Sequence, residues 1–385
     1  MATYKTPGVY IEETRKFPHS FAKEPTSVVA FIGYTTITAD NEGNSILLSP
    51  KRIRSWNDFV AVFGYHSSSK YLPDAVSLFY TNGGGDCYII SVGAVNEPVS
   101  LSSLVNGLNK SKEIKVQLIV IPDACLLPSQ DFYDLQKQTL ASCNALQDRF
   151  AIIDTQQPAA GTANDSSLFR AGIGNDDLKW GAAYYPWLVL ADGRPVPPSG
   201  AIAGIYTMVD NNRGVWKAPA NVSLSGATDL TVHINNDQQN DLTIPIDGKA
   251  INAIRVFADK GLLVWGARTL DGNSQDWRYL NVRRTITMIE NSIKNSSSWV
   301  VFEPNDAKTW ILLRAIIENF LTLLWREGAL AGAKPEDAFD VQIGLGSTMT
   351  ASDILEGRLV VTVKLAVLRP AEFIVISFVH KMQQS

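Results

Sequence analysis

Four short runs that are apolar on both faces predict buried β-strands in the first half of the chain. They are rich in β-branched and aromatic residues, which favour a central position in a sheet. The runs are residues 28–34, 87–92, 118–122 and 149–154. Because helix-like stretches separate them, the order of strand, helix and strand indicates at least partly parallel pairing.

Three helices are predicted between these strands. Ser55 can cap the first and Gly64 can end it. The second ends at the glycines of residues 83–85. In the third, apolar residues recur at three- and four-residue spacing from Phe132 to Leu146, which is typical of one helix face.

The strongest helical pattern covers residues 306–327. Asn305 or Asp306 can cap this helix and Gly328 can end it. Its apolar arc is wide, which indicates packing on several sides. A narrow polar stripe remains, with one residue at every fourth position: Arg314, Glu318, Thr322 and Arg326. This stripe is either a solvated edge or a seam that faces a partner.

The remaining elements of the second half have weaker patterns. A helix from about 276 to 294 would pair Glu290 with Lys294 on its outer side. Its buried face would consist of Val282, Ile286, Ile289 and Ile293. Short strands are predicted at 229–235, 241–246 and 262–270, after a Pro/Gly-rich link at 192–200.

Both ends of the chain have the pattern of extended arms. The first 25 residues contain too few apolar groups for a core of their own, and residues 9–12 alternate like a strand. Two apolar runs, 359–368 and 372–379, close the chain on either side of Pro370. Because the last run is apolar on both faces, leaving it unpaired in water would favour edge-to-edge association.

The composition is that of a soluble globular protein, with 45% hydrophobic and 19% charged residues. The net charge of −4 argues against a nucleic-acid binder. We find no run of about 18 apolar residues and no signal-peptide core, so we expect a protein that is kept in the cytoplasm or leaves without a signal. Cys87, Cys125 and Cys143 contain no CxxC pair and are interpreted as reduced, buried thiols.

No motif for catalysis, a cofactor or a metal is evident. The four histidines share no metal-ligand spacing. The glycines 83–85 follow a helix and precede a strand, the reverse of a phosphate-binding loop, and indicate a helix stop. Asp123, Asp154 and Asp192 follow strands or precede turns, where α/β enzymes often place acids, but turn chemistry also explains them.

Twelve segments, in order along the chain, resemble contractile phage tail sheath proteins and the sheath subunits of related bacterial injection particles. They are PGVYIEE (7–13), VVAFIGY (28–34), NGGGDCYII (82–90), YYPWLVL (184–190), VPPSG (196–200), RGVWKAPAN (213–221), INAIR (251–255), VWGARTL (264–270), WRYLNVRR (277–284), VFEPN (301–305), LWREGALAG (324–332) and PAEFIVI (370–376). The resemblance is weakest over about 93–180, a region that varies most in this family and tends to face outward.

The resemblance implies a structural subunit and no enzyme. Such subunits stack as hexameric rings around an inner tube, their terminal arms add strands to sheets of adjacent subunits, and contraction drives the tube through a target envelope. The implied partners are further copies of the chain, an inner tube protein, and baseplate and terminal cap proteins. Direct nucleic-acid binding, membrane insertion and cofactors are not implied. Assembly would take place in the bacterial cytoplasm, into a phage tail or a released tail-like particle.

The resemblance also assigns residues to two surfaces. Strand exchange between subunits is assigned to Val9, Tyr10, Ile11, Glu12, Phe373, Ile374, Val375, Ile376 and Phe378. Contact with the inner tube is assigned to Arg283, Arg284, Arg314, Glu318 and Arg326, because the family places the C-terminal part on the inner wall. Arg283 and Arg284 can equally pair with acids inside the subunit.

The expected fold is α/β plus α+β, with a mixed, partly parallel sheet in the central domain and a C-terminal α+β sheath domain. The expected division is an N-terminal arm at 1–27, an α/β domain at 28–195 that faces outward in part, a sheath core at 196–369 and a C-terminal arm at 370–385. Two alternatives are an α/β enzyme such as a hydrolase, with Asp154 or Asp192 in its site, and a non-contractile lattice or adhesion protein.

Overall fold

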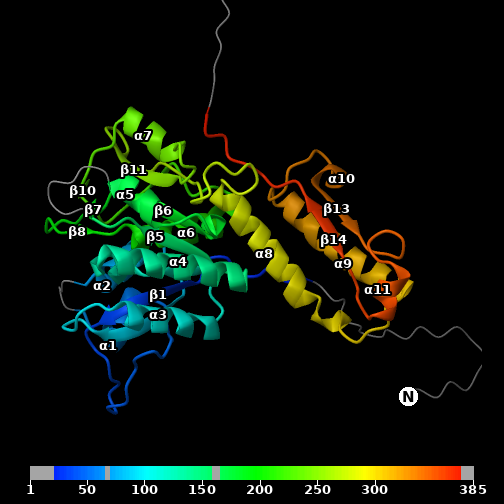
Figure 1. Ribbon diagram of the computed structural model, residues 1–385, viewed down its shortest axis with the longest axis horizontal. Coiled ribbons are helices and arrows are strands. Elements are labelled where there is room, and N and C mark those ends of the chain that lie inside the picture. The colour runs from blue at the N-terminus through cyan, green and yellow to red at the C-terminus, as the bar shows by residue number, and fades with distance from the viewer. Residues whose placement is uncertain (1–20, 66–69, 158–164, 374–385) are drawn as a thin grey trace, which may run out of the picture.

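A computed structural model of the protein describes residues 21–65, 70–157 and 165–373 (Figure 1). An α/β body forms one end of the molecule and a smaller α+β part forms the other. Helix α8 (Leu280–Ser296) extends from the body toward the smaller part. The predicted fold class, α/β plus α+β with a mixed sheet, is confirmed.

A nine-stranded sheet, counted over the described residues, forms the centre of the body. Its order is β2 (Lys51–Ile53), β3 (Cys87–Ala94), β1 (Val29–Thr35), β4 (Leu118–Val120), β5 (Phe150–Asp154), β6 (Gly181–Tyr185), β11 (Ile251–Phe257), β12 (Gly261–Val264) and β9 (Val222–Ser223). The strands from β3 to β11 pair in parallel, whereas β2, β12 and β9 pair antiparallel. The predicted parallel pairing of β4 and β5 around a helix is confirmed.

Helices cover both faces of this sheet. One layer contains α1 (Trp56–Phe63), α2 (Leu72–Thr81) and α6 (Ser199–Arg213), and the other contains α3 (Leu101–Lys110), α4 (Ser129–Leu146), α5 (Asp165–Gly172) and α7 (Asn236–Thr243). Strand β1 is buried along its whole length because Val29 and Phe31 pack on the first layer while Ala30 and Ile32 pack on the second. Short 3-10 helices lie at Ser111–Glu113, Pro122–Leu126, Leu178–Trp180 and Ser298–Val300.

Local signals that were read from the sequence set several helix ends. The Ser55 hydroxyl accepts the N–H of Asp58 at 3.1 Å, and Gly64 ends α1 with φ of +69°. Gly83 follows α2 with φ of +89°, so the predicted helix stop is confirmed. Asp306 caps α9 (Ala307–Arg326) by accepting the N–H of Thr309 at 3.0 Å.

Two strand predictions are wrong for most of their length. At 229–235 only β10 (Asp229–Leu230) forms, and 241–246 contains the end of α7. Asn235 and Gln238 form a capping box, in which each side chain accepts the other residue's backbone N–H, at 2.8 and 3.0 Å. This cap starts a helix where the alternating pattern predicted a strand.

The strand predicted at 262–270 ends early, at Val264. Beyond it the regular ladder stops, although Trp265 N–H still donates to the Ala253 carbonyl and Leu270 N–H to the Gly181 carbonyl, both at 2.8 Å, and a side chain of β11 bonds to the segment between them. The backbone N–H of Arg268 donates to Asn252 Oδ1 at 2.7 Å, and Asn252 Nδ2 donates to the Arg268 carbonyl at 2.7 Å.

The predicted ion pair between Glu290 and Lys294 on α8 is not observed. Glu290 instead accepts from Arg283 Nη2 at 2.7 Å.

The α+β part packs around α8 and α9. It also contains α10 (Pro335–Ala338), β13 (Phe339–Gln342), α11 (Ala351–Leu355) and β14 (Thr362–Leu365). Met288 and Ile289 of α8 contact a core that includes Ile317 and Phe320 of α9 and Val341 of β13. A small sheet of β10, β7 (Leu188–Val189) and β8 (Pro195–Val196) lies in the α/β body.

The large sheet continues past residue 195, where we expected the first domain to end. Helix α6 packs on α2, and β11 and β12 extend the same sheet. We therefore propose a division closer to the start of α8 than to residue 195.

Candidate assembly site

Strands β13 and β14 form a separate antiparallel sheet in the α+β part. Val341 lies opposite Val363, and Phe339 opposite Leu365. Among the described residues this sheet has two strands, so each strand has one edge without a partner strand there. A two-stranded sheet is marginally stable alone, and its open edges can accept further strands.

Helix α9 supports this sheet with one face and exposes apolar residues on another. The buried face consists of Leu313, Ile317, Phe320, Leu321 and Leu324. On the other side, Ile311 is 69% exposed, Leu312 46% and Leu323 48%. Arg314 Nε donates to Glu318 Oε1 at 2.7 Å on this same side. The polar stripe therefore borders an exposed apolar patch.

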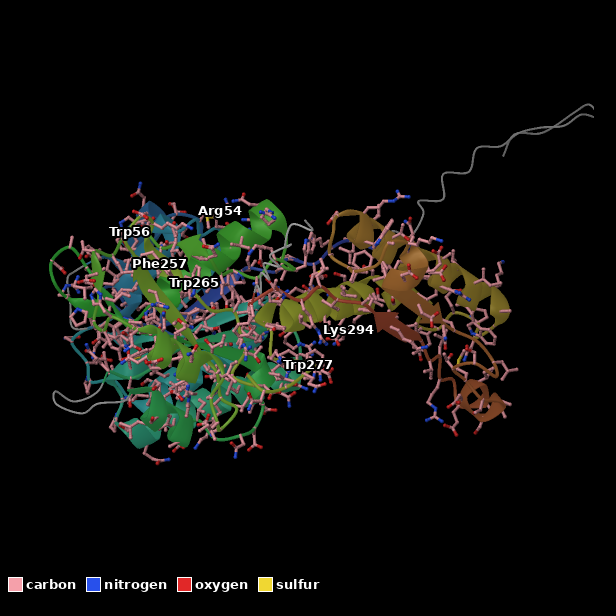
Figure 2. The ribbon with its side chains drawn as sticks, turned by 90° about the horizontal axis from the view of Figure 1, so that it is seen from above. Arg54, Trp56, Phe257, Trp265, Trp277 and Lys294 are labelled. Carbon is pink, nitrogen blue, oxygen red and sulfur yellow. The ribbon has the colours of Figure 1, made fainter. Side chains whose placement is uncertain are left out.

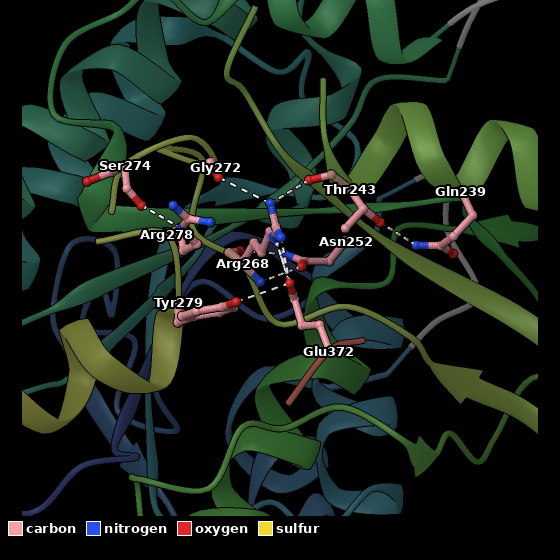
Figure 3. A network of polar contacts seen from close by, with 9 residues as sticks. All are labelled: Gln239, Thr243, Asn252, Arg268, Gly272, Ser274, Arg278, Tyr279 and Glu372. Atoms are coloured by element: carbon pink, nitrogen blue, oxygen red, sulfur yellow. Dashed lines mark hydrogen bonds and ion pairs between the residues drawn. The ribbon is translucent and has the colours of Figure 1, made fainter. Parts of the chain in front are cut away.

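The C-terminal arm is attached to the body by an ion pair. Arg268 Nε donates to Glu372 Oε1 at 3.0 Å, and Arg268 Nη2 to Oε2 at 2.5 Å (Figure 3). The Tyr279 hydroxyl donates to the same carboxylate at 3.3 Å. Burial alone would lower the pKa of Arg268, but the adjacent Glu372 raises it above its ordinary value. Four residues earlier, the Leu368 carbonyl accepts from Asn281 Nδ2 at 3.1 Å.

The root of the N-terminal arm lies against the α+β part. The rings of Phe21 and Phe320 are 5.9 Å apart. Lys23 Nζ lies 4.4 Å from the ring centre of Trp216 and 3.3 Å from the Glu327 carboxylate. Both arms therefore begin from defined positions on the folded subunit.

A cavity of about 860 Å³ lies beside these roots. Its lining includes Trp216, Trp265, Gly328, Arg369 and Phe373, which come from the body, the end of α9 and the C-terminal arm.

An aromatic pair lies beside this cavity on the body. The ring centres of Trp265 and Phe257 are 4.6 Å apart (Figure 2). Trp265 also lines the cavity, so the indole forms an apolar part of the cavity wall.

The structure corrects the assignment of two arginines to the inner tube. Arg283 is 3% exposed, and its guanidinium lies between the rings of Trp180 and Trp277, at 4.6 and 4.3 Å. Arg284 is 5% exposed and forms an ion pair with Asp210. Since buried guanidinium groups offer no surface to a partner, the alternative of pairing inside the subunit is the observed one. Arg314, Glu318 and Arg326 are not buried and stay candidates.

Most residues assigned to strand exchange lie outside the described residues. These are Val9, Tyr10, Ile11 and Glu12 near the start, and Ile374, Val375, Ile376 and Phe378 near the end. Phe373 is described, and it is 66% exposed. Their exchange between subunits stays a prediction.

The acids considered for an enzyme have structural contacts. Asp123 lies where the parallel strand order reverses, between β1 and β4, a common ligand position in such sheets. Its buried carboxylate accepts the N–H groups of Tyr34, Tyr71 and Leu72. Burial raises the pKa of Asp123 to about 6, although these hydrogen bonds lower it. The carboxylate is thus engaged by three backbone donors.

The other two acids differ in burial and in their hydrogen-bond partners. Asp154 is buried and accepts the N–H of Ser199 at 2.7 Å, at the start of α6. Burial raises its pKa to about 7. Asp192 is exposed in a turn and binds Arg194, whose side-chain hydrogen bond lowers the pKa of the carboxyl.

Two further observations apply to the described residues alone. Within 21–65, 70–157 and 165–373, we find no group of three His, Cys, Asp or Glu side chains placed to hold a metal ion. None of the helices in these ranges is long and apolar enough to cross a membrane.

Sequence reasoning missed the ion pair that holds the C-terminal arm. Arg268 and Glu372 both lie in segments that carry the resemblance, VWGARTL and PAEFIVI. Because 104 residues separate them, no periodicity could have joined them.

Comparison with known proteins gives family matches over most of the chain. The phage tail sheath protein central domain matches residues 100–270, and the phage tail sheath C-terminal domain matches residues 273–381.

Solved sheath structures match almost end to end. The sheath complex of an extracellular contractile injection system (PVC), in its contracted state, is 34% identical, with a TM-score of 0.78, over 99% of both chains. The helical sheath of the anti-feeding prophage (AFP), also contracted, is 34% identical, with a TM-score of 0.77, over 98% of this chain and 100% of that one.

A curated relative matches over a shorter part. The tail sheath protein of Vibrio phage KVP40 is 27% identical over 34% of this chain. The match spans 19% of that relative's length, well under two thirds. Domain matches from residue 100 to residue 381, together with sheaths aligned along nearly their whole length, show that this chain belongs to the contractile tail sheath family.

Proposed function

We propose that the chain is a structural subunit that polymerises as stacked hexameric rings around an inner tube. In this proposal the sheath contracts and drives the tube through a target cell envelope. The observation that carries it is the open β13–β14 sheet of the α+β part, against which the root of the N-terminal arm packs, while the C-terminal arm leaves from the neighbouring body. The match to contracted sheaths supports the same function.

The arms of neighbouring subunits would complete the β13–β14 sheet by strand addition. In this mode main-chain hydrogen bonds give affinity and alternate side chains give register. Each hydrogen bond contributes about 0.5–1.5 kcal/mol and each buried Val, Ile or Phe about 1.5–3 kcal/mol. Ordering a free arm costs about 1–2 kcal/mol per residue. For one arm, the favourable binding free energy modestly exceeds the cost of ordering the chain. Two arms per subunit, repeated through a lattice, make dissociation slow.

The exposed side of α9 is the surface we assign to the inner tube. It combines an apolar patch with the charged groups Arg314, Glu318 and Arg326. Apolar residues rimmed by charges are typical of protein-binding surfaces. A tube that contacts this face would explain why the wide apolar arc of α9 is covered on one side alone in the subunit.

The remaining partners follow from the proposed role. Further copies of the chain, a baseplate and a terminal cap would bind the sheath, as part of a phage tail or a released tail-like particle assembled in the bacterial cytoplasm. One similar chain belongs to the AFP baseplate structure. We propose no catalytic activity, because the buried acids Asp123 and Asp154 accept backbone N–H groups where helices α2 and α6 begin.

Negative-stain electron microscopy of the full chain, expressed alone, tests the proposal. Helical tubes or stacked rings are the expected result, because the arms and the acceptor sheet are in one chain. Discrete small particles at high protein concentration would count against a sheath. Tubes that cannot be made to contract in complete particles would favour the non-contractile lattice.

A further inference from the structure

The turn between α8 and α9 has a bulky aromatic residue at a position that favours glycine (Figure 1). The backbone N–H of Glu303 donates to the Val300 carbonyl at 3.0 Å, and Val301 has φ of −65° and ψ of 123°. Phe302 follows with φ of +72°, which is the pattern of a type II turn. A bulky side chain is strained at this second central position, where Gly or Asn is preferred. Phe302 is also fully exposed, so the core of the subunit does not compensate for the strain.

The residues that follow hold this turn in place. Asn305 Nδ2 donates to the Arg358 carbonyl at 3.0 Å, and Asn305 Oδ1 accepts from Trp310 Nε1 at 2.7 Å. Val301, next to Phe302, is 65% exposed. The turn therefore presents two apolar side chains from a fixed backbone, and a strained residue that its surroundings hold in this way often belongs to a binding site.

The cavity of about 860 Å³ beside the body has an apolar wall that suits such a side chain. Trp216, Ile244 and Trp265 belong to its lining. Ile244 is 56% exposed, so this wall is open to a partner. An apolar cavity of about 150 Å³ already holds a benzene ring, so a phenyl group has ample space here.

The same cavity has positive charge that the subunit does not neutralise. Among the residues that the structure describes, Arg213, Lys217 and Arg369 of the lining form no ion pair. The acids of the lining, Glu327 and Glu372, are each paired with another base. Burial and the nearby charge of Arg213 lower the pKa of Lys217, which shows that like charges lie close together. A partner with an acidic group beside an apolar one would be complementary.

A subunit cannot place this turn in its own cavity. The turn lies before α9 and is tied to its first turn through Trp310, whereas Gly328, just after α9, lines the cavity. The 20 residues of α9, at about 1.5 Å each, separate the two by about 30 Å. A turn and a cavity at different places on one chain give a head-to-tail contact between copies, which propagates into rings or filaments.

We propose that Phe302 of one subunit enters the cavity of a neighbouring copy, with Glu303 facing the positive charge at its rim. This contact is separate from the exchange of terminal strands. The inference rests on the proposed function, since a second copy is in reach only in an assembly.

Cross-linking in tubes of the full chain tests the contact. Val301→Cys and Ile244→Cys are combined in a Cys125→Ala background, because Cys87 and Cys143 are buried. A short bismaleimide should join subunits of the tubes into a ladder of covalent oligomers. Leu168→Cys, 58% exposed on α5 and outside the cavity lining, replaces Ile244→Cys in the control and should give no ladder.

Two cross-linking results would overturn the proposal. One is a ladder of equal yield from the control pair. The other is no ladder from Val301→Cys with Ile244→Cys. If Ile244→Cys then joins Tyr10→Cys of a neighbouring subunit, the occupant of the cavity is the N-terminal arm.

Phe302→Gly separates binding from folding. Glycine adopts the positive φ without strain, so the melting temperature should be at or above that of the wild type. The critical concentration for tubes should nevertheless rise on the order of tenfold, because an apolar anchor is lost. Leu355→Ser, 89% exposed and outside the cavity lining, should leave the critical concentration unchanged.

The outcomes for Phe302→Gly also distinguish this inference from the proposed function. A lower melting temperature would assign Phe302 to folding, and an unchanged critical concentration would exclude it from the interface; either result overturns the inference alone. A wild-type chain that forms no tubes would instead count against the proposed function.

Discussion

Buried carboxylates in this subunit act as structural acceptors at the ends of parallel strands. Asp123 lies just after β4 and Asp154 is the last residue of β5, the position at which many α/β enzymes place catalytic acids. Here both accept backbone N–H groups from the segments that begin helices α2 and α6. The same residues that would suggest an enzyme therefore fix helices to the sheet.

Asp154→Asn should make the protein more stable at pH 8. Burial raises the pKa of Asp154 from 3.8 to about 7, so its contribution is fully present below about pH 4 and is lost as pH rises through 7. Asparagine cannot ionise, so it avoids this loss and should add on the order of 1–3 kcal/mol to the free energy of unfolding at pH 8. Urea unfolding between pH 4 and 8 measures it.

Asp192→Asn is the control for this prediction. In the wild type, the hydrogen bond from Arg194 lowers the pKa of the Asp192 carboxyl. The stability that this carboxylate contributes is therefore lost only as the pH falls through the acid range. The variant should leave the slope between pH 5 and 8 unchanged. If the free energy of unfolding of Asp154→Asn changes with pH as that of the wild type does, Asp154 does not titrate as described.

Arg284→Leu should destabilise the isolated subunit. The change leaves the Asp210 carboxylate buried with one charged partner fewer, at a cost of about 3–5 kcal/mol. Arg326→Leu, at an exposed position on α9, should change the free energy of unfolding by no more than about 0.5 kcal/mol. Denaturant titration of both variants measures the contribution of the buried Arg284 pair, and equal stabilities would contradict its structural role.

Elements with a strong local signal were predictable. Helix α1 follows from Ser55 and Gly64, and β1 from a run that is apolar on both faces. The strand predicted at 241–246 was wrong because the capping box of Asn235 and Gln238 starts a helix just before it. Alternation over six residues is a weaker signal than a satisfied helix start.

Exposed residues of α9 should matter for tube binding and not for folding. Leu312→Asp changes a side chain that is 46% exposed, so the melting temperature should stay within about 2–4 °C of the wild type. Association with the inner tube, measured by co-sedimentation, should fall because a charge replaces an apolar contact. Leu355→Asp, which is 89% exposed on α11, is the control, and equal tube binding by both variants would exclude this face.

Phe373→Asp should prevent polymerisation while the subunit stays folded. The side chain is 66% exposed in the subunit and is assigned to the shared sheet, where a charge would be buried. Sedimentation should show a subunit of unchanged circular dichroism that does not form tubes. Leu168→Asp, at a 58% exposed position on α5, should still assemble. Tubes from the Phe373 variant would remove this residue from the interface.

At the scale of the whole molecule, the sequence indicated where the arms are but not how they are held. The apolar run around Phe373 and the break at Pro370 were visible in the pattern of residues. The ion pair of Arg268 and Glu372 was not, because it depends on the fold bringing distant segments together. For the same reason Arg284 could not be separated from a surface arginine until its burial was known.

Deleting residues 374–385 from the full chain tests the central claim most directly. The deletion keeps Glu372 and its ion pair with Arg268, and it removes most of the C-terminal segment assigned to strand exchange. Negative-stain microscopy of wild-type and deleted protein at equal concentration gives the result. The account predicts tubes or stacked rings for the wild type, and none for a deleted chain with an unchanged melting temperature. Normal tubes from the deleted chain would contradict it.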